Sequence, residues 1–261
     1  MKLCLLTYNI PRAWSMPRLV QAARTYGFSA LELRCEQGHG HGVELDVSPE
    51  DRRRARSIVQ DGYLEIAGLG TSARFESPDL AERQRQVDSA RRFIELAADV
   101  GAGFIKVFGN DVPAGVDRGD CSAYVADALR TLGEFAEPAG INVLLEMHGE
   151  FNYWGLARDT MRLADHPRVG LIYNSDPRDI AAGSVAATYS HVRQWIRHVH
   201  IAEFSGRYPY AELFDLLKAD RYDRYLAAEI SKEIPPPEEY LATYSALFRA
   251  WAGQPFFPIG D

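Results

Sequence analysis

The sequence predicts a single (β/α)8 barrel, an α/β fold, from its length, its composition and the regular alternation of short apolar runs with longer amphipathic stretches. The chain has 261 residues, close to the roughly 250 that eight parallel strands and their helices need. With 46% hydrophobic and 25% charged residues, its composition is that of an ordinary globular protein with a large core. We therefore expect residues 1–261 to form one domain.

Eight short runs rich in Leu, Ile, Val or Ala are each followed by a longer amphipathic stretch, the pattern of successive βαβ units with parallel strands. The expected strands are Leu3–Tyr8, Ala30–Arg34, Leu64–Leu69, Phe104–Phe108, Ile141–Met147, Val169–Asn174, Ile196–Ala202 and Tyr225–Ile230. The expected helices are 16–26, 49–61, 79–100, 121–138, 156–165, 178–195, 210–218 and 237–252. An open doubly wound sheet would also alternate in this way, but its first strand-to-helix turn should carry a GxGxxG phosphate loop. That turn reads Asn9-Ile10-Pro11-Arg12-Ala13-Trp14, which favours the closed barrel.

The charge and the cysteines limit the class of partner. A formal net charge of -7 argues against a protein that binds nucleic acid or an anionic membrane through phosphate neutralisation, so we expect a small-molecule ligand. Cys4, Cys35 and Cys121 are odd in number and far apart, which indicates neither a disulfide framework nor a thiolate zinc site. The first apolar run is too short for a secretory signal, and no later stretch is long enough to span a membrane. These features are typical of a cytoplasmic protein.

Polar residues lie at the ends of four consecutive expected strands. They are Glu146, Asn174, His200 and Glu229, separated by 28, 26 and 29 residues. One βα unit separates each from the next, so we expect all four to meet above one end of the barrel. Two carboxylates in a poorly solvated mouth repel each other unless a cation lies between them. Three oxygen donors and one imidazole favour Mn²⁺, with Mg²⁺, Co²⁺ and Zn²⁺ as alternatives.

Neighbouring polar residues have both functional and structural interpretations. Asp176 competes with Asn174 as a ligand, although its place before Pro177 favours a helix N-cap. His198 has the same strand parity as His200 but lies one layer deeper, which predicts a hydrogen-bonded supporting histidine. The loop Glu36–Gly42 contains two histidines and is interpreted as a substrate loop or an exposed turn rather than a metal site.

Several residues near the expected strand ends are candidates for substrate binding. Arg34, Lys106 and Arg74 would bind substrate oxygens or a phosphate, or would form structural ion pairs instead. His148 would reach the substrate or orient a ligand. Aromatic residues in the same loops would wall a sugar-sized pocket. The full candidate set is His148, Arg34, Lys106, Arg74, Glu203 and Trp14.

With these motifs in place, the chain resembles the xylose isomerase-like TIM-barrel superfamily of sugar phosphate isomerases and epimerases over its whole length. That superfamily includes D-tagatose 3-epimerase, hydroxypyruvate isomerase, inosose dehydratase and endonuclease IV. The motifs that carry the resemblance are Leu145–Gly149, Val169–Asn174, His198–Glu203 and Ala228–Ile230. Such relatives hold one divalent ion with Glu, Asp, His and Glu in this strand order, so the resemblance implies the same site here, with Asn174 in place of the expected acid. A histidine that relatives often carry three residues later is Pro177 in this chain.

The resemblance implies an enzyme that removes a proton beside a carbonyl through a metal-stabilised enediolate. Glu146 and Glu229 would be its catalytic acid/base pair, acting on a small sugar, keto-sugar or sugar acid. A metal-dependent dehydratase of a keto-cyclitol or related polyol would use the same site. Less favoured are an endonuclease IV-like nuclease, which needs extra histidines on the third and fourth strands, and a non-catalytic ligand-binding barrel. By analogy with relatives, we expect a homodimer or larger homo-oligomer.

Overall fold

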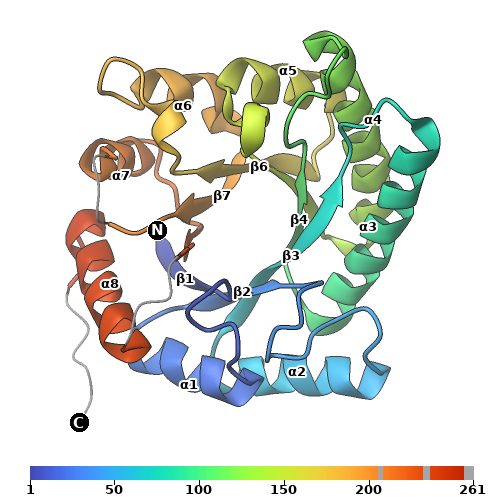
Figure 1. The fold of residues 1–261 in the computed structure, drawn as a ribbon. Helices are drawn as coiled ribbons and strands as arrows, with labels where there is room; N and C mark the ends of the chain where they lie inside the picture. The colour runs from blue at the N-terminus through green and yellow to red at the C-terminus, as the bar shows by residue number, and fades with distance from the viewer. Residues whose placement is uncertain (205–207, 232–235, 256–261) are drawn as a thin grey trace.

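The computed structural model describes residues 1–204, 208–231 and 236–255. Its eight strands pair in parallel in sequence order, and β8 pairs with β1 to close the sheet. The strands are β1 (Lys2–Leu6), β2 (Ala30–Arg34), β3 (Glu65–Arg74), β4 (Phe104–Phe108), β5 (Asn142–Glu146), β6 (Val169–Asn174), β7 (Ile196–Ile201) and β8 (Tyr225–Ala228). Figure 1 shows this ring of strands inside a ring of helices. The predicted (β/α)8 TIM barrel is confirmed.

Within the described residues, eight α-helices follow the strands one by one. They are α1 (Met16–Thr25), α2 (Pro49–Asp61), α3 (Leu80–Val100), α4 (Arg118–Ala136), α5 (Trp154–Ala164), α6 (Ala186–Val192), α7 (Tyr210–Ala219) and α8 (Pro237–Ala252). Local sequence explains several of their first turns. Ser48 accepts a hydrogen bond from the backbone of Asp51 at the start of α2, and Asp79 accepts one from Ala81 at the start of α3. None of the helices described is long and apolar enough to cross a membrane.

Several element boundaries differ from the sequence prediction, and two elements differ most. The helix expected over 178–195 is a 3-10 turn at Pro177–Asp179, the short α6 and a second 3-10 turn at Arg193–Trp195. Between them Ala182 and Gly183 both have positive φ, and Ala181 bridges Ser184, so a tight turn interrupts the helical pattern. The third strand, expected to end at Leu69, continues to Arg74, which pairs with Phe108 after a shift in register.

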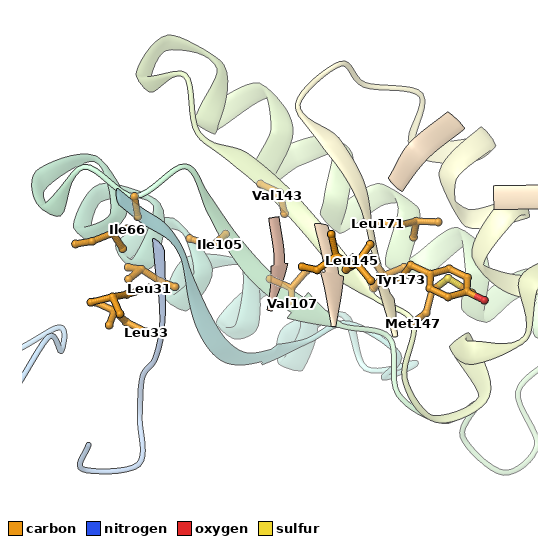
Figure 2. Close-up of a cluster of buried hydrophobic side chains, with 14 of the residues drawn as sticks. Leu31, Leu33, Ile66, Ile105, Val107, Val143, Leu145, Met147, Leu171 and Tyr173 are labelled. Atoms are coloured by element: carbon orange, nitrogen blue, oxygen red, sulfur yellow. The ribbon is translucent and has the colours of Figure 1, made fainter. Parts of the chain in front are cut away.

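Strand parity sorts the side chains into two layers. One set points outward and packs under the helices; those labelled in Figure 2 are Leu31, Leu33, Ile66, Ile105, Val107, Val143, Leu145, Met147, Leu171 and Tyr173. The other set points into the barrel, where a small apolar cluster contains Cys4, Leu6, Ala30, Ala67, Phe104, Leu144, Ile172 and Ala227. Because residues two apart share a face, Glu32, Lys106 and Glu146 continue the inner set toward the C-terminal ends of the strands. The floor of the mouth is therefore polar.

Candidate active site

The four residues expected to hold a metal converge at the C-terminal end of the barrel. Nδ1 of His200 lies 3.2 Å from Oε1 of Glu146 and 3.6 Å from Oε2 of Glu229. The amide of Asn174 donates to the same Glu146 oxygen at 3.1 Å. Glu146 and Asn174 are the last residues of β5 and β6, and Glu229 directly follows β8. The regular sequence spacing therefore places their side chains together, as expected.

Lys106 joins this group from β4. Its ammonium lies 2.9 Å from Oε2 of Glu146 and 3.5 Å from the centroid of the Phe108 ring. The side chains of Lys106 and Glu146 are both buried. A buried carboxylate without a partner is costly, so this ion pair holds Glu146 in its ionised form. Sequence analysis expected Lys106 to bind substrate or to form a structural ion pair. The structure shows its ammonium paired with a candidate metal ligand.

Glu32 is the residue of this centre that sequence analysis missed. It lies on β2, only 1% exposed, and accepts hydrogen bonds from Nε2 of His198 at 2.9 Å and from Nε2 of His200 at 3.1 Å. By binding Nε2 of His200, Glu32 directs the other ring nitrogen toward Glu146 and Glu229. A signal was present, because Glu32 alternates with Leu31 and Leu33 and shares its parity with Arg34. The deeper, supporting place expected for His198 is what the structure shows.

The carboxyl groups of the centre differ in acidity. Burial alone would raise the pKa of Glu146, but Lys106 and His200 hold it below its ordinary range. The pKa of Glu229 is raised, first by burial and then by the nearby Glu146 carboxylate. Burial works against a charged His200, yet Glu32 and Glu229 raise its pKa well above the ordinary value. A positive charge therefore lies among the carboxylates, as their mutual repulsion demands.

The donor set fits a divalent cation. Glu146, His200 and Glu229 each offer a ligand atom, and these atoms lie within 4.8 Å of one another. Oε2 of Glu146 faces Lys106, while its Oε1 faces His200, so both contacts are compatible with one carboxylate. Two oxygens and one imidazole nitrogen suit Mn²⁺, Zn²⁺ and related ions.

The fourth ligand remains a prediction. The amide nitrogen of Asn174 faces Glu146, and ligation through its oxygen needs rotation of the amide group. The carboxylate of Asp176, the other candidate for the fourth ligand, caps the turn at Pro177–Asp179 and pairs with Arg178 at 2.5 Å. The N-cap interpretation of Asp176 is thus the one that the structure supports.

The remaining substrate-binding candidates occupy different surroundings. His148 is exposed, with Nδ1 3.1 Å from Oδ1 of Asn110. Trp14 is buried beneath the guanidinium of Arg18. Glu203 accepts hydrogen bonds from the backbone and hydroxyl of Ser231 at 2.9 Å.

The two arginines among these candidates differ sharply. Arg74 is 59% exposed and pairs loosely with Glu76 at 3.6 Å, so the structure does not bring it into the cluster. Arg34 is the last residue of β2, and its guanidinium lies over the Tyr8 ring, 4.5 Å from the ring centroid.

The histidine-containing loop after β2 is not the exposed turn that composition suggested as one interpretation. His39 and His41 are 5% and 6% exposed, and their rings stack 5.6 Å apart. Nε2 of His41 bonds the carbonyl of Arg34, and the backbone of Gly40 donates to the carbonyl of Arg12. Burial lowers the pKa of each histidine to about 4, so both are neutral at physiological pH. The loop folds back as part of the barrel wall.

Comparison with known proteins identifies the relatives of this barrel. A family model described as "Xylose isomerase-like TIM barrel" matches residues 20–250. A 3-dehydroshikimate dehydratase from Pseudomonas aeruginosa is 26% identical over 238 residues, which cover 83% of this chain and 36% of the relative. An L-ribulose-5-phosphate 3-epimerase from Salmonella paratyphi B is 25% identical over 132 residues, 49% of this chain and 46% of that protein. The chain thus spans less than half the length of these two curated relatives.

A solved structure shares the whole fold at low sequence identity. The IolI protein with a bound zinc atom superposes with a TM-score of 0.79 at 15% identity, and the alignment covers 99% of this chain and 100% of that one. At this identity the likeness establishes the fold.

Proposed function

Because the chain belongs to the xylose isomerase-like TIM barrel family, we propose that it is a divalent-metal-dependent isomerase or epimerase of a small sugar, keto-sugar or sugar acid. The observation that carries this proposal is the pair of carboxyl groups of Glu146 and Glu229, which both face Nδ1 of His200 at the mouth of the barrel. Two carboxyl groups close together can remove a proton beside a carbonyl and return one.

Glu146 is the proposed base. Lys106 and His200 keep its carboxylate ionised, so it is ready to accept a proton from the carbon beside the substrate carbonyl. Glu229 is the proposed partner that returns the proton, because its carboxyl group faces the same nitrogen of His200 from β8. If they face opposite sides of the reacting carbon, the product is the epimer, whereas return to the neighbouring carbon gives the isomer.

Glu146, His200 and Glu229 are the proposed protein ligands of the ion, with Asn174 as the fourth. When bound, the ion would act as a Lewis acid that polarises the substrate carbonyl and makes the adjacent carbon acidic. Mn²⁺ is our first choice because oxygen donors predominate, with Mg²⁺, Co²⁺ and Zn²⁺ as alternatives. The zinc atom in the related IolI structure supports a metal in this fold.

A dehydratase is the second candidate. It is favoured by the match to 3-dehydroshikimate dehydratase, which extends over 83% of this chain. The same base would remove the same kind of proton, and loss of a β-hydroxyl would replace proton return. Product mass separates the two, since only the dehydratase product is lighter by one water.

Solvent exchange tests the acid/base pair. With Mn²⁺ and a panel of ketoses and keto acids in D₂O, the native protein should incorporate deuterium beside the carbonyl, and Glu146→Gln and Glu229→Gln should each abolish that exchange. Glu150→Gln is the matched control, because Glu150 lies close to Glu146 in sequence and pairs with Arg118 at 2.9 Å. Exchange that persists in both active-site variants would refute the assignment.

We also propose a cytoplasmic location and a homodimer or larger homo-oligomer, in line with the sequence analysis. Cys4, Cys35 and Cys121 are all buried and free, as a reducing compartment allows. That residues 1–261 form one domain stays a prediction, since part of this range lies outside the described residues. Light scattering of the purified protein tests the oligomeric state.

A further inference from the structure

Two inward-facing cations flank a glycine at one level of the barrel mouth. Arg34 on β2 pairs in register with Gly70 on β3, and Gly70 pairs with Lys106 on β4. In-register residues of neighbouring parallel strands point to the same side of the sheet. The outward side chains Leu33 and Leu69 that precede Arg34 and Gly70 are fully buried in the outer core, so Arg34 and Gly70 face inward.

Gly70 leaves space between the two cations. A Cβ added there would lie 3.6 Å from Cα of Arg34 and 3.7 Å from Cε of Lys106, with no closer atom. Gly68, one inner position below, differs, because a Cβ there would lie 2.3 Å from the Phe104 ring. The position below is thus filled by packing, whereas a side chain at Gly70 would fit without a clash. A methyl group at Gly70 would therefore touch both Arg34 and Lys106.

Both cations retain donors that the protein does not use. Among the described residues, the Arg34 guanidinium has the Tyr8 ring as its neighbour and makes no hydrogen bond or ion pair. In the part of the chain that the structure describes, the Lys106 ammonium has three N–H groups and one hydrogen-bonding partner, Glu146. An arginine fork and an ammonium on either side of a glycine suit a carboxylate or phosphate, whose oxygens accept several hydrogen bonds at once.

We propose that Arg34 and Lys106, separated by Gly70, bind an oxyanionic group of the substrate, so that the substrate is a sugar acid or sugar phosphate rather than a neutral sugar. This inference rests on the proposed function, because the bound group belongs to the molecule that reacts. Lys106 belongs to this subsite and also pairs with Glu146. The anionic group would therefore bind close to the proposed base. The two curated relatives carry names with an acid and a phosphate ester, which agrees with this chemistry.

Binding of simple anions tests the subsite without turnover. Inorganic phosphate and glycolate are titrated calorimetrically into the metal-free full-length protein, which separates the two oxyanion types. We expect at least one of them to bind, and Arg34→Gln to weaken its binding about tenfold or more, the usual cost of losing a charged hydrogen-bond donor. Gly70→Ala should also weaken binding, because its methyl would lie between Arg34 and Lys106. Arg74→Gln is the matched control, an arginine at the end of the adjacent strand that is exposed and lies outside the cluster. The added methyl of Gly70→Ala makes only ordinary contacts, and its thermal midpoint checks folding.

Turnover provides the second measurement and separates the two proposals. With L-ribulose 5-phosphate, L-ribulose and 3-dehydroshikimate as probes, kcat/KM should be at least tenfold higher for an anionic substrate, and Arg34→Gln should remove that preference mainly through KM. Equal kcat/KM for neutral and anionic probes, or anion binding that is undetectable or unchanged in both variants, overturns the subsite. Deuterium exchange into a neutral ketose would then still support the proposed reaction.

Discussion

Replacement of Asn174 by aspartate tests whether residue 174 lies beside the proposed metal ion. The Asn174 amide lies 3.1 Å from Oε1 of Glu146, so Asn174→Asp brings two carboxylates to about that separation. At an effective dielectric constant of about 20, like charges 3.1 Å apart repel by about 5 kcal/mol. This is an upper bound, because the groups can separate or take up a proton. A destabilisation of half this repulsion energy would lower the unfolding midpoint of the metal-free protein by roughly 5–10 °C.

A divalent ion reverses this effect, because it converts the repulsion into two favourable contacts. Added Mn²⁺ should therefore raise the midpoint of Asn174→Asp more than that of the native protein, by an amount that grows with the affinity ratio. Scanning fluorimetry after chelator treatment, with and without Mn²⁺, measures both changes. Asn174→Ala is the control, since it removes the amide without adding charge. Equal metal responses in the native protein and Asn174→Asp would refute the place of residue 174 beside the ion.

Three further outcomes follow from other contacts. Glu32→Gln should weaken Mn²⁺ binding about 10- to 100-fold, because it loosens the orientation of His200; an unchanged dissociation constant would contradict that role. Burial, with a contribution from Asp176, raises the pKa of Asp179 from 3.8 to about 8, so the folded state retains a proton that the unfolded chain releases, and stability falls as pH rises from about 4 to about 8. Asp179→Asn should remove this pH dependence of stability. The variant should be more stable than the native protein at pH 8 by a few kcal/mol, with little difference near pH 4. If urea denaturation gives the same difference in unfolding free energy at both pH values, Asp179 is not the group responsible. Leu145→Ala should cost about 2–5 kcal/mol of unfolding free energy and leave KM unchanged, because Leu145 is buried in the outer core; a large change in KM would show that the two layers are coupled.

The strands were predictable because hydrophobic runs of fixed length identify them, and the interval between polar strand ends located the centre. Strands β2, β4 and β6 have the expected bounds. The interruption before α6 was harder to predict from sequence, since it depends on the backbone conformation of Ala182 and Gly183. A helical pattern there has no strong local signal against it.

Side-chain pairing across the barrel was the part that sequence could not supply. Glu32 and His198 are 166 residues apart and meet only because β2 and β7 both face the barrel interior. Likewise, Lys106 is a strand-end cation by sequence, but its pairing with Glu146 depends on the register of β4 against β5. Local patterns identify which residues face inward, whereas closure of the sheet decides which of them touch.

The alternation of inward and outward side chains separates what this barrel must keep from what it can change. The outward residues of Figure 2 pack under the helices. Their side-chain size is constrained, because a lost methylene in a close-packed core costs stability. Inward positions near the mouth, such as Gly70 and Asn174, carry much less of that packing. Substitutions there alter charge and shape around the substrate without removing methylenes from the outer core. One scaffold can in this way give rise to enzymes with different substrates while its outer core stays the same.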